Sequence, residues 1–267
     1  MRRILGRRRS SHAAEDSVWI SFSDLMTSLL TIFMLAAVVL VLSLTQKQEA
    51  LAHEKATAEA QQEAFSEQIG SLSKAEQVRA QMLVEIRDAL ATQGIAVTVS
   101  KDNSVLSIPT SLLGFDSGSY DIRPEHQGVA LAIGDTIAKV IEKKERYRYL
   151  DTVFVEGHTD NQSFDGLDGT GNWGLSTFRA ISLWRLWDAQ LPQGRQLDEI
   201  RRDDGRPLFS VSGYGDSRPA TQAQATDADR AANRRIDIRF TETRLTAEDL
   251  AAILDPQVTG ARAQDDE

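Results

Sequence analysis

Hydrophobic residues are concentrated in one run near the start of the chain. Leu25 to Leu44 are twenty consecutive residues without a charge. At a rise of about 1.5 Å per residue, a helix over this run is about 30 Å long. That length matches the hydrocarbon core of a bilayer. The pattern therefore predicts a single transmembrane helix over residues 17–45.

The next segment, residues 46–93, is rich in Ala, Gln, Glu and Lys, contains no proline, and predicts a helix. Its apolar residues alternate in steps of four and three, as in a coiled-coil seam, although Glu76 and Arg79 interrupt the pattern. A short parallel dimer and a solvated spacer, with a possible role as a channel plug, both remain open. The seam consists of Phe65, Ile69, Leu72, Leu83, Ile86 and Leu90.

Beyond Gly94 the pattern changes to short strands alternating with helices. Such alternation predicts an α/β (α+β) sandwich, a sheet backed by helices, over residues 94–245. We expect residues 246–267 to form a short helix and a disordered tail, of which residues 255–267 are polar. The predicted strands are 95–100 and 104–108, paired as a hairpin, then 150–156, 209–214 and 235–241, and the predicted helices are 124–146 and 172–189.

Composition excludes several functions. The chain contains no cysteine, which excludes disulfides, thiolate metal sites and a thiol nucleophile. A net charge of −9 argues against nucleic-acid binding. His12, His53, His126 and His158 show no metal-ligand spacing, and the sequence offers no nucleophile–base pair. We therefore expect neither an enzyme nor a resident cofactor or metal.

Charge near the apolar run sets the expected orientation. Residues 1–16 carry five arginines against Glu15 and Asp16. By the positive-inside rule this tail stays in the cytoplasm, which places residues 46–267 across the membrane. A nucleic-acid patch is the alternative function of the arginines. A cleaved signal peptide is the alternative for the apolar run, since Ala50-Leu51-Ala52 resembles a cleavage site.

An aspartate, Asp24, lies at the cytoplasmic end of the apolar run. An ionised aspartate in the bilayer core costs about 2.5–3.5 kcal/mol, and such residues usually mark ion pathways. The alternative is a simple helix cap. Hydroxyl residues lie near the same level, and those three, four and seven positions on share the helix face of Asp24. They are Ser21, Thr27, Ser28 and Thr31.

The string Ser-Asp-Leu-Met-Thr behind a tryptophan and before an apolar run resembles the N-terminal helix of MotB-type stator subunits. The resemblance covers residues 17–44. It implies that Asp24 is the ion-carrying residue of an ion-driven motor and that the transported ion is H⁺ or Na⁺. Because a single helix cannot enclose a water path, it also implies a multi-span MotA-like or ZorA-like partner and two copies of this chain.

A second group of charged residues lies in the predicted sandwich. A strand ends at His158-Thr159-Asp160, and Arg179 follows on a helix that also carries Asn172, two turns earlier. A carboxylate facing a guanidinium suits a zwitterionic ligand, because the first attracts an ammonium and the second a carboxylate. A structural salt bridge between strand and helix is the alternative.

Several motifs, in order, resemble OmpA-like peptidoglycan-binding domains. The resemblance implies that Asp160 and Arg179 hold the diaminopimelate of a peptide stem, and that Thr159, Asn172, Phe115 and Asp116 line the pocket. Two segments depart from the family pattern, a long loop at 161–171 and an apparent insertion at 190–208. The motifs are Gly-Phe-Asp-Ser-Gly (114–118), Gly-His-Thr-Asp (157–160), Asn-x-x-Leu-Ser-x-x-Arg-Ala (172–180), Gly-Tyr-Gly-Asp-Ser-Arg-Pro (213–219) and Asn-Arg-Arg-Ile-Asp-Ile (233–238).

Together the two resemblances imply a stator B-subunit of the bacterial inner membrane, with a cytoplasmic N-terminus and a periplasmic domain that binds peptidoglycan. The short chain, residues 19–27 and the 190–208 segment resemble the B-subunit of Zorya antiphage defence systems more than flagellar MotB. A flagellar stator remains the second interpretation. A passive wall tether, in which Asp24 carries no ion, is the third.

Overall fold

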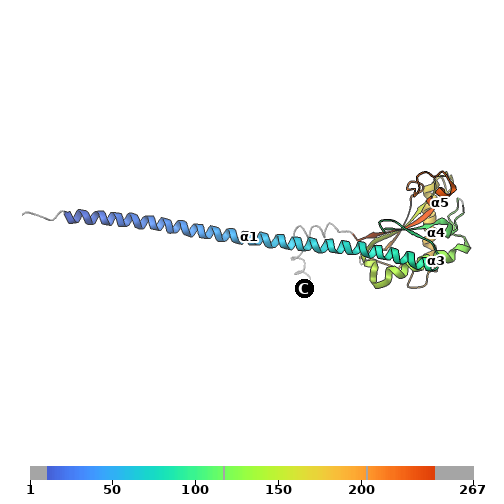
Figure 1. The fold of residues 1–267 in the computed structure, drawn as a ribbon, viewed down its shortest axis with the longest axis horizontal. Helices are drawn as coiled ribbons and strands as arrows, with labels where there is room; N and C mark the ends of the chain where they lie inside the picture. Colours follow the sequence, from blue (N-terminus) through green and yellow to red (C-terminus); the bar gives the residue numbers. More distant parts are fainter. Residues whose placement is uncertain (1–10, 117, 203, 244–267) are drawn as a thin grey trace, which may run out of the picture. The chain divides into compact units, whose positions relative to one another are not determined.

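A computed structural model describes residues 11–116, 118–202 and 204–243. The chain divides after Ala64 into an N-terminal part and a compact part that begins at Phe65 (Figure 1). Predictions for residues 1–10 of the basic tail and for the 246–267 segment concern residues outside those described.

The N-terminal part consists of helix α1 (Ser11–Thr92), which continues into the compact part. The helices predicted at 17–45 and 46–93 are thus one element. From Val18 on, α1 is long and apolar enough to cross a membrane. The large hydrophobic side chains between Val18 and Leu44 are exposed in the protein alone, as a lipid-facing segment requires.

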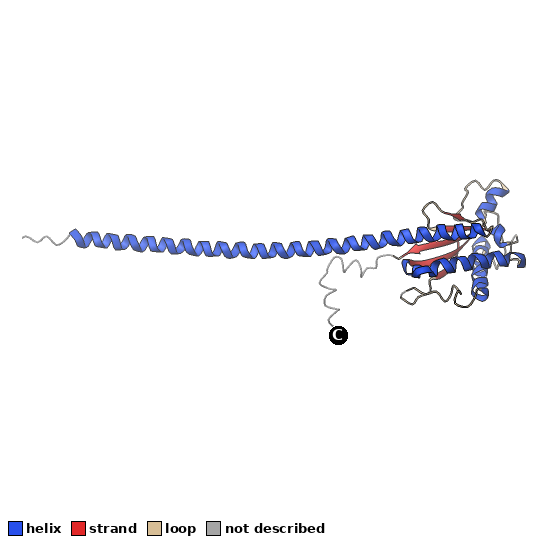
Figure 2. Ribbon diagram, turned by 60° about the horizontal axis from the view of Figure 1, so that its bottom comes forward, coloured by secondary structure: helices blue, strands red, loops and turns tan. Residues whose placement is uncertain are grey.

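The compact part is built on a mixed sheet, whose strands are red in Figure 2. The sheet has five strands in the order β1-β2-β5-β3-β4. Only β3 and β4 run parallel, and the other neighbouring strands are antiparallel. The strands are β1 (Thr98–Val99), β2 (Val105–Pro109), β3 (Leu150–His158), β4 (Phe209–Gly213) and β5 (Arg235–Glu242).

The predicted fold class is confirmed, and every predicted strand and helix of the domain has its counterpart. Two longer helices are α3 (Pro124–Glu142) and α4 (Gly171–Gln190). The helix predicted to reach residue 146 ends earlier, because Lys144 and Glu145 have positive φ within the 3-10 helix η1 (Lys143–Tyr149). The sequence analysis missed two short helices, α2 (Thr110–Leu113) and α5 (Asp227–Asn233).

One hydrophobic core joins the inner face of the sheet to the helices. Side chains from β2, β3 and β5 meet those of α3 and α4, where Trp187 is fully buried and its Nε1 donates a 2.7 Å hydrogen bond to the carbonyl of Ala130. Residues 191–208 also reach this core, so the apparent insertion is packed against the domain. Its buried side chains are Leu191, Leu197, Ile200 and Leu208.

The last turns of α1 belong to this core. Leu83, Ile86 and Leu90, half of the predicted seam, are fully buried among the domain's own side chains. Arg79, which interrupts the seam, pairs with Glu242 of β5 at 2.8 Å. The part of the seam left for another helix is therefore Phe65, Ile69 and Leu72, of which Phe65 and Ile69 are well exposed.

Candidate functional site

A cavity of about 460 Å³ opens at the carboxyl end of β3. All six residues predicted for the pocket line it: Phe115, Asp116, Thr159, Asp160, Asn172 and Arg179. Residues about 65 positions apart are thus brought to one place, since Asp116 precedes α3 and Arg179 lies in α4.

Close packing of α4 on β3 gives the cavity its shape. A Cβ built on Gly157 would lie only 1.9 Å from the carbonyl oxygen of Ser176, so only glycine fits there. The Ser176 hydroxyl accepts a hydrogen bond from the Gly215 amide at 2.9 Å, and the Gly215 carbonyl accepts one from the Thr159 amide at 2.8 Å. Strand end, helix and the loop after β4 are therefore fixed to one another beside the cavity.

Asp160 is buried and pairs with an arginine other than the expected one. Arg234 Nη1 donates to Asp160 Oδ2 at 2.5 Å, and the Gln162 amide donates to Oδ1 at 3.2 Å. The alternative of a structural salt bridge from Asp160 to Arg179 is thus replaced by one from Asp160 to Arg234, just before β5. Arg234 also lines the cavity, as does Arg230, so both add a cation to the site besides Arg179.

Arg179 is held by backbone carbonyls and an aromatic ring. Its Nε donates to Ser119 O at 2.8 Å and its Nη2 to Asp116 O at 3.1 Å, while the guanidinium carbon lies 5.3 Å from the centre of the Phe115 ring. The side chain is only 3% exposed. Burial lowers the pKa of Arg179 to about 10, with Asp160 opposing the change. The guanidinium is therefore charged at neutral pH. Among the described residues, its hydrogen bonds go to backbone carbonyls and not to a carboxylate.

Thr159 contributes a hydroxyl with no partner. The residue is 3% exposed, and among the described residues nothing hydrogen-bonds to its Oγ1. A buried polar atom left unpaired costs free energy. Because Thr159 lines the cavity, a ligand group that reached this hydroxyl would supply the missing partner.

Asn172 positions the long loop that follows Asp160. Its Nδ2 donates to Gln162 O at 2.9 Å. Phe164 of the same loop also lines the cavity. The 161–171 segment, noted in the sequence as unusual, thus forms one wall of the site.

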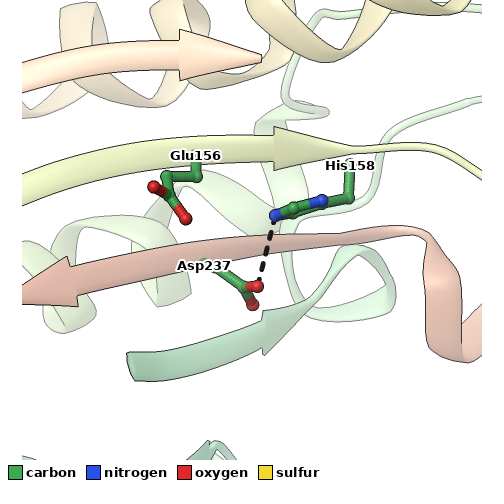
Figure 3. Close-up of side chains that lie close together, drawn as sticks. All are labelled: Glu156, His158 and Asp237. Atoms are coloured by element: carbon green, nitrogen blue, oxygen red, sulfur yellow. Dashed lines mark ion pairs between the residues drawn. The ribbon is translucent and has the colours of Figure 1, made fainter. Parts of the chain in front are cut away.

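A buried cluster of Glu156, His158 and Asp237 lies on the neighbouring strands β3 and β5 (Figure 3). These residues offer ligand atoms within 4.8 Å of one another. However, Arg239 Nε donates to both oxygens of Glu156, at 3.0 and 3.1 Å, and Arg235 Nε donates to Asp237 at 3.0 Å. A cation would have to displace these contacts, so the cluster is a charge-compensated network.

The contacts in this network change the titration of Asp237. Burial raises the pKa of the carboxyl. The contact with His158, whose Nε2 is 3.2 Å from Oδ2, and the charge of Arg235 lower the pKa by more than burial raises it. The net result is a pKa below the ordinary value.

The predicted ion-carrying residue lies in the other part of the chain. Asp24 and its supporting hydroxyls Ser21 and Ser28 are exposed on α1. Thr27 Oγ1 donates to Ser23 O at 2.7 Å, and Thr31 Oγ1 donates to Thr27 O at 2.8 Å. These threonines satisfy their own hydroxyl donors within the helix, as side chains in an apolar environment must.

Comparison with known proteins shows a family similarity within the domain. The model of the OmpA family matches residues 114–234, a span that contains all six predicted cavity residues and Arg234. The part of the domain that holds the cavity, which follows a long apolar helix, is therefore similar to the OmpA family. No curated protein matches the chain.

Solved structures similar to the chain include three bacterial proteins. The cell wall anchor of the T6SS from Pseudomonas aeruginosa is 27% identical, with 60% of this chain and 97% of that chain covered and a TM-score of 0.43. A protein described as MotB-like from Desulfovibrio vulgaris is 18% identical (64% and 99% covered, TM-score 0.47). The periplasmic domain of Helicobacter pylori MotB is 22% identical (57% and 85% covered, TM-score 0.41).

Sequence reasoning missed part of the cavity lining. Arg234 belongs to the quoted Asn-Arg-Arg motif but was given no role, and Phe164, Asp227 and Arg230 were not noted. The register of β5 against β3, which pairs His158 with Arg235, brings Arg234 to Asp160 across 74 residues. The Asn-Arg-Arg motif was the only feature of the sequence that could have pointed to Arg234.

Proposed function

We propose that this chain is the peptidoglycan-anchored subunit of an ion-driven complex of the bacterial inner membrane. The observation that carries the proposal is the combination, in one chain, of an acidic residue in a membrane-length helix and a charged cavity in an OmpA-like domain. One elementary charge crossing 100 mV releases about 2.3 kcal/mol. That energy drives movement only if part of the complex is held fixed, and the cell wall is the rigid object available.

The cavity suits a zwitterionic group such as diaminopimelate. Arg179 is a buried cation that donates to backbone carbonyls, so it favours a carboxylate of the ligand. Asp160 attracts an ammonium, although Arg234 already neutralises part of its charge. The unpaired Thr159 hydroxyl supplies a further hydrogen bond.

Wall binding is tested by sedimentation of the full-length protein, in detergent, with diaminopimelate-type peptidoglycan. We expect Arg179→Ala and Asp160→Ala to abolish co-sedimentation. Arg185→Ala, which removes an exposed arginine from the same helix, is the matched control and should bind like the wild type. Undiminished binding by both cavity variants would contradict the wall-binding assignment.

Ion transport is tested separately at Asp24. When the chain is co-expressed with a MotA-like multi-span subunit, Asp24→Asn should abolish ion flux into vesicles while membrane insertion is unchanged. Glu49→Gln, a carboxylate outside the apolar run, is the control. Flux that survives Asp24→Asn would reduce the protein to a passive tether.

The narrower form of the proposal is a proton-driven complex in Zorya-type antiphage defence, supported by residues 19–27 and by the packed 190–208 segment. Cells carrying the chain and its neighbouring genes should resist phage, and Asp24→Asn should remove that resistance. If the genes instead restore motility to a stator-deficient strain, the flagellar alternative holds.

A further inference from the structure

Two large hydrophobic side chains are exposed on the domain. Among the described residues after α1, these are Trp173 and Phe178, 55% and 40% exposed, and both lie in α4. The Phe178 ring pairs with the half-buried ring of Tyr120, with centroids 5.4 Å apart and a tilt of 36°. The Tyr120–Phe178 pair is therefore an aromatic surface built from two segments.

This surface adjoins the charged cavity. Phe178 immediately precedes Arg179, and Tyr120 immediately follows Ser119, whose carbonyl accepts the 2.8 Å hydrogen bond from Arg179. The neighbouring Gly118 lines the cavity and lies close to Phe164. A Cβ built on Gly118 would lie 3.0 Å from the Phe164 ring. The Tyr120–Phe178 pair is thus next in sequence to residues that line or hold the cavity.

We propose that Tyr120 and Phe178 form a stacking surface for a sugar ring of the glycan strand whose peptide stem occupies the cavity. The inference rests on the proposed wall-binding function. A pyranose ring presents C–H groups on its faces, and these suit the negatively polarised face of an aromatic ring. Its hydroxyls lie around the edge of the ring, and Asp121, which follows Tyr120 in the sequence, has an exposed polar side chain.

The size of the surface favours a sugar over a protein partner. A stable protein interface buries at least about 1,000 Å² in total. Two rings flanked by charged residues offer much less apolar area, but they match the area of a single pyranose. Peptidoglycan also carries its stem peptides on sugars, so a peptide in the cavity brings a sugar close to the rim.

The experiment compares two probes on the full-length protein in detergent. One is a muropeptide that carries the disaccharide, and the other is the free stem peptide of the same sequence. The wild type should bind the muropeptide more tightly. Phe178→Ala should weaken muropeptide binding about fivefold and leave peptide binding unchanged, as expected for the loss of one stacking contact.

Three further variants make the outcome decisive. Phe178→Tyr should retain the affinity for the muropeptide. Trp173→Ala removes an aromatic residue about 140° away around the same helix and should change neither affinity. Arg179→Ala should weaken both.

The inference fails if Phe178→Ala affects both probes equally or neither of them. It also fails if Trp173→Ala alone reduces muropeptide binding. Failure of the proposed function is distinct, because the wild type would then bind neither probe and Arg179→Ala would have no effect.

Discussion

Charged side chains around the cavity differ in how far their neighbours satisfy them. Asp160 is neutralised by Arg234. Arg179 donates instead to two uncharged carbonyls, so its positive charge is available to pair with a ligand carboxylate. The glycine at 157 allows this arrangement because α4 can approach β3 closely enough for Arg179 to reach the cavity. The recognition chemistry therefore depends on backbone packing as much as on the charged residues.

The unpaired hydroxyl of Thr159 leads to a prediction in which stability and binding change in opposite directions. Thr159→Val keeps the shape and removes the buried polar atom, so the free energy of unfolding should rise by about 1 kcal/mol. Affinity for a stem peptide should fall about tenfold, since the hydroxyl no longer bonds the ligand. Chemical denaturation and peptide titration measure the two effects.

Thr159→Ser retains the hydroxyl and serves as the control for the binding measurement. If Thr159→Val bound the peptide as tightly as the wild type, the hydroxyl would have no role in recognition.

At the cavity, the sequence identifies residues that lie within recognisable motifs and misses those that depend on strand register. Asp160 and Arg179 could be proposed from a strand end and a helix spacing. Arg234 could not be assigned, because its contact with Asp160 exists only once β5 pairs with β3. The same holds for Asp237, which meets His158 across that register.

Among the elements, α1 shows most clearly the difference between pattern and packing. Its heptad spacing predicts a surface for another helix, but Leu83, Ile86 and Leu90 pack inside the domain. Periodicity shows that one face of a helix is buried without showing which partner buries it. The short helix α5 was not predicted for another reason. Its seven residues are too few to show a helical period, and only the Thr226 capping box marks its start.

The packing of α1 predicts a large effect for one core substitution. Leu83→Ala should lower the free energy of unfolding of the domain by about 2–5 kcal/mol, as for other buried leucines. Leu51→Ala, at an exposed position of the same helix, should change it by less than about 0.5 kcal/mol. Denaturant titration followed by tryptophan fluorescence, which reports on the buried Trp187, distinguishes the two. Equal effects would show that the end of α1 is not part of the core.

At the scale of the whole molecule, stability should depend on acidic pH. Neighbouring groups lower the pKa of five carboxyls, those of Glu85, Asp102, Asp135, Asp229 and Asp237. A carboxyl with a lowered pKa stabilises the folded state above its unfolded pKa, and this contribution is lost as the pH falls through the folded pKa. Unfolding free energy should therefore decrease below about pH 4.

The buried Asp237 should account for part of this decrease. Asp237→Asn should lower stability at pH 7 and reduce the slope of the acid limb, because Arg235 and His158 lose their charged partner. Asp216→Asn, at an exposed position, should leave the curve unchanged. Denaturation series from pH 3 to pH 7 give both curves, and parallel acid limbs for wild type and Asp237→Asn would contradict the role of Asp237.

The buried turns at the end of α1 also determine where the protein can be divided and rejoined. A chimera that moves the wall-binding domain onto a different anchor must carry the native residues from about Ala75 onward, the first position of α1 that is buried. A junction placed at Gly94, just after the helix ends at Thr92, would leave the interior open on one side. The chimera would then misfold and fail to bind murein, even with every ligand-contacting residue in place.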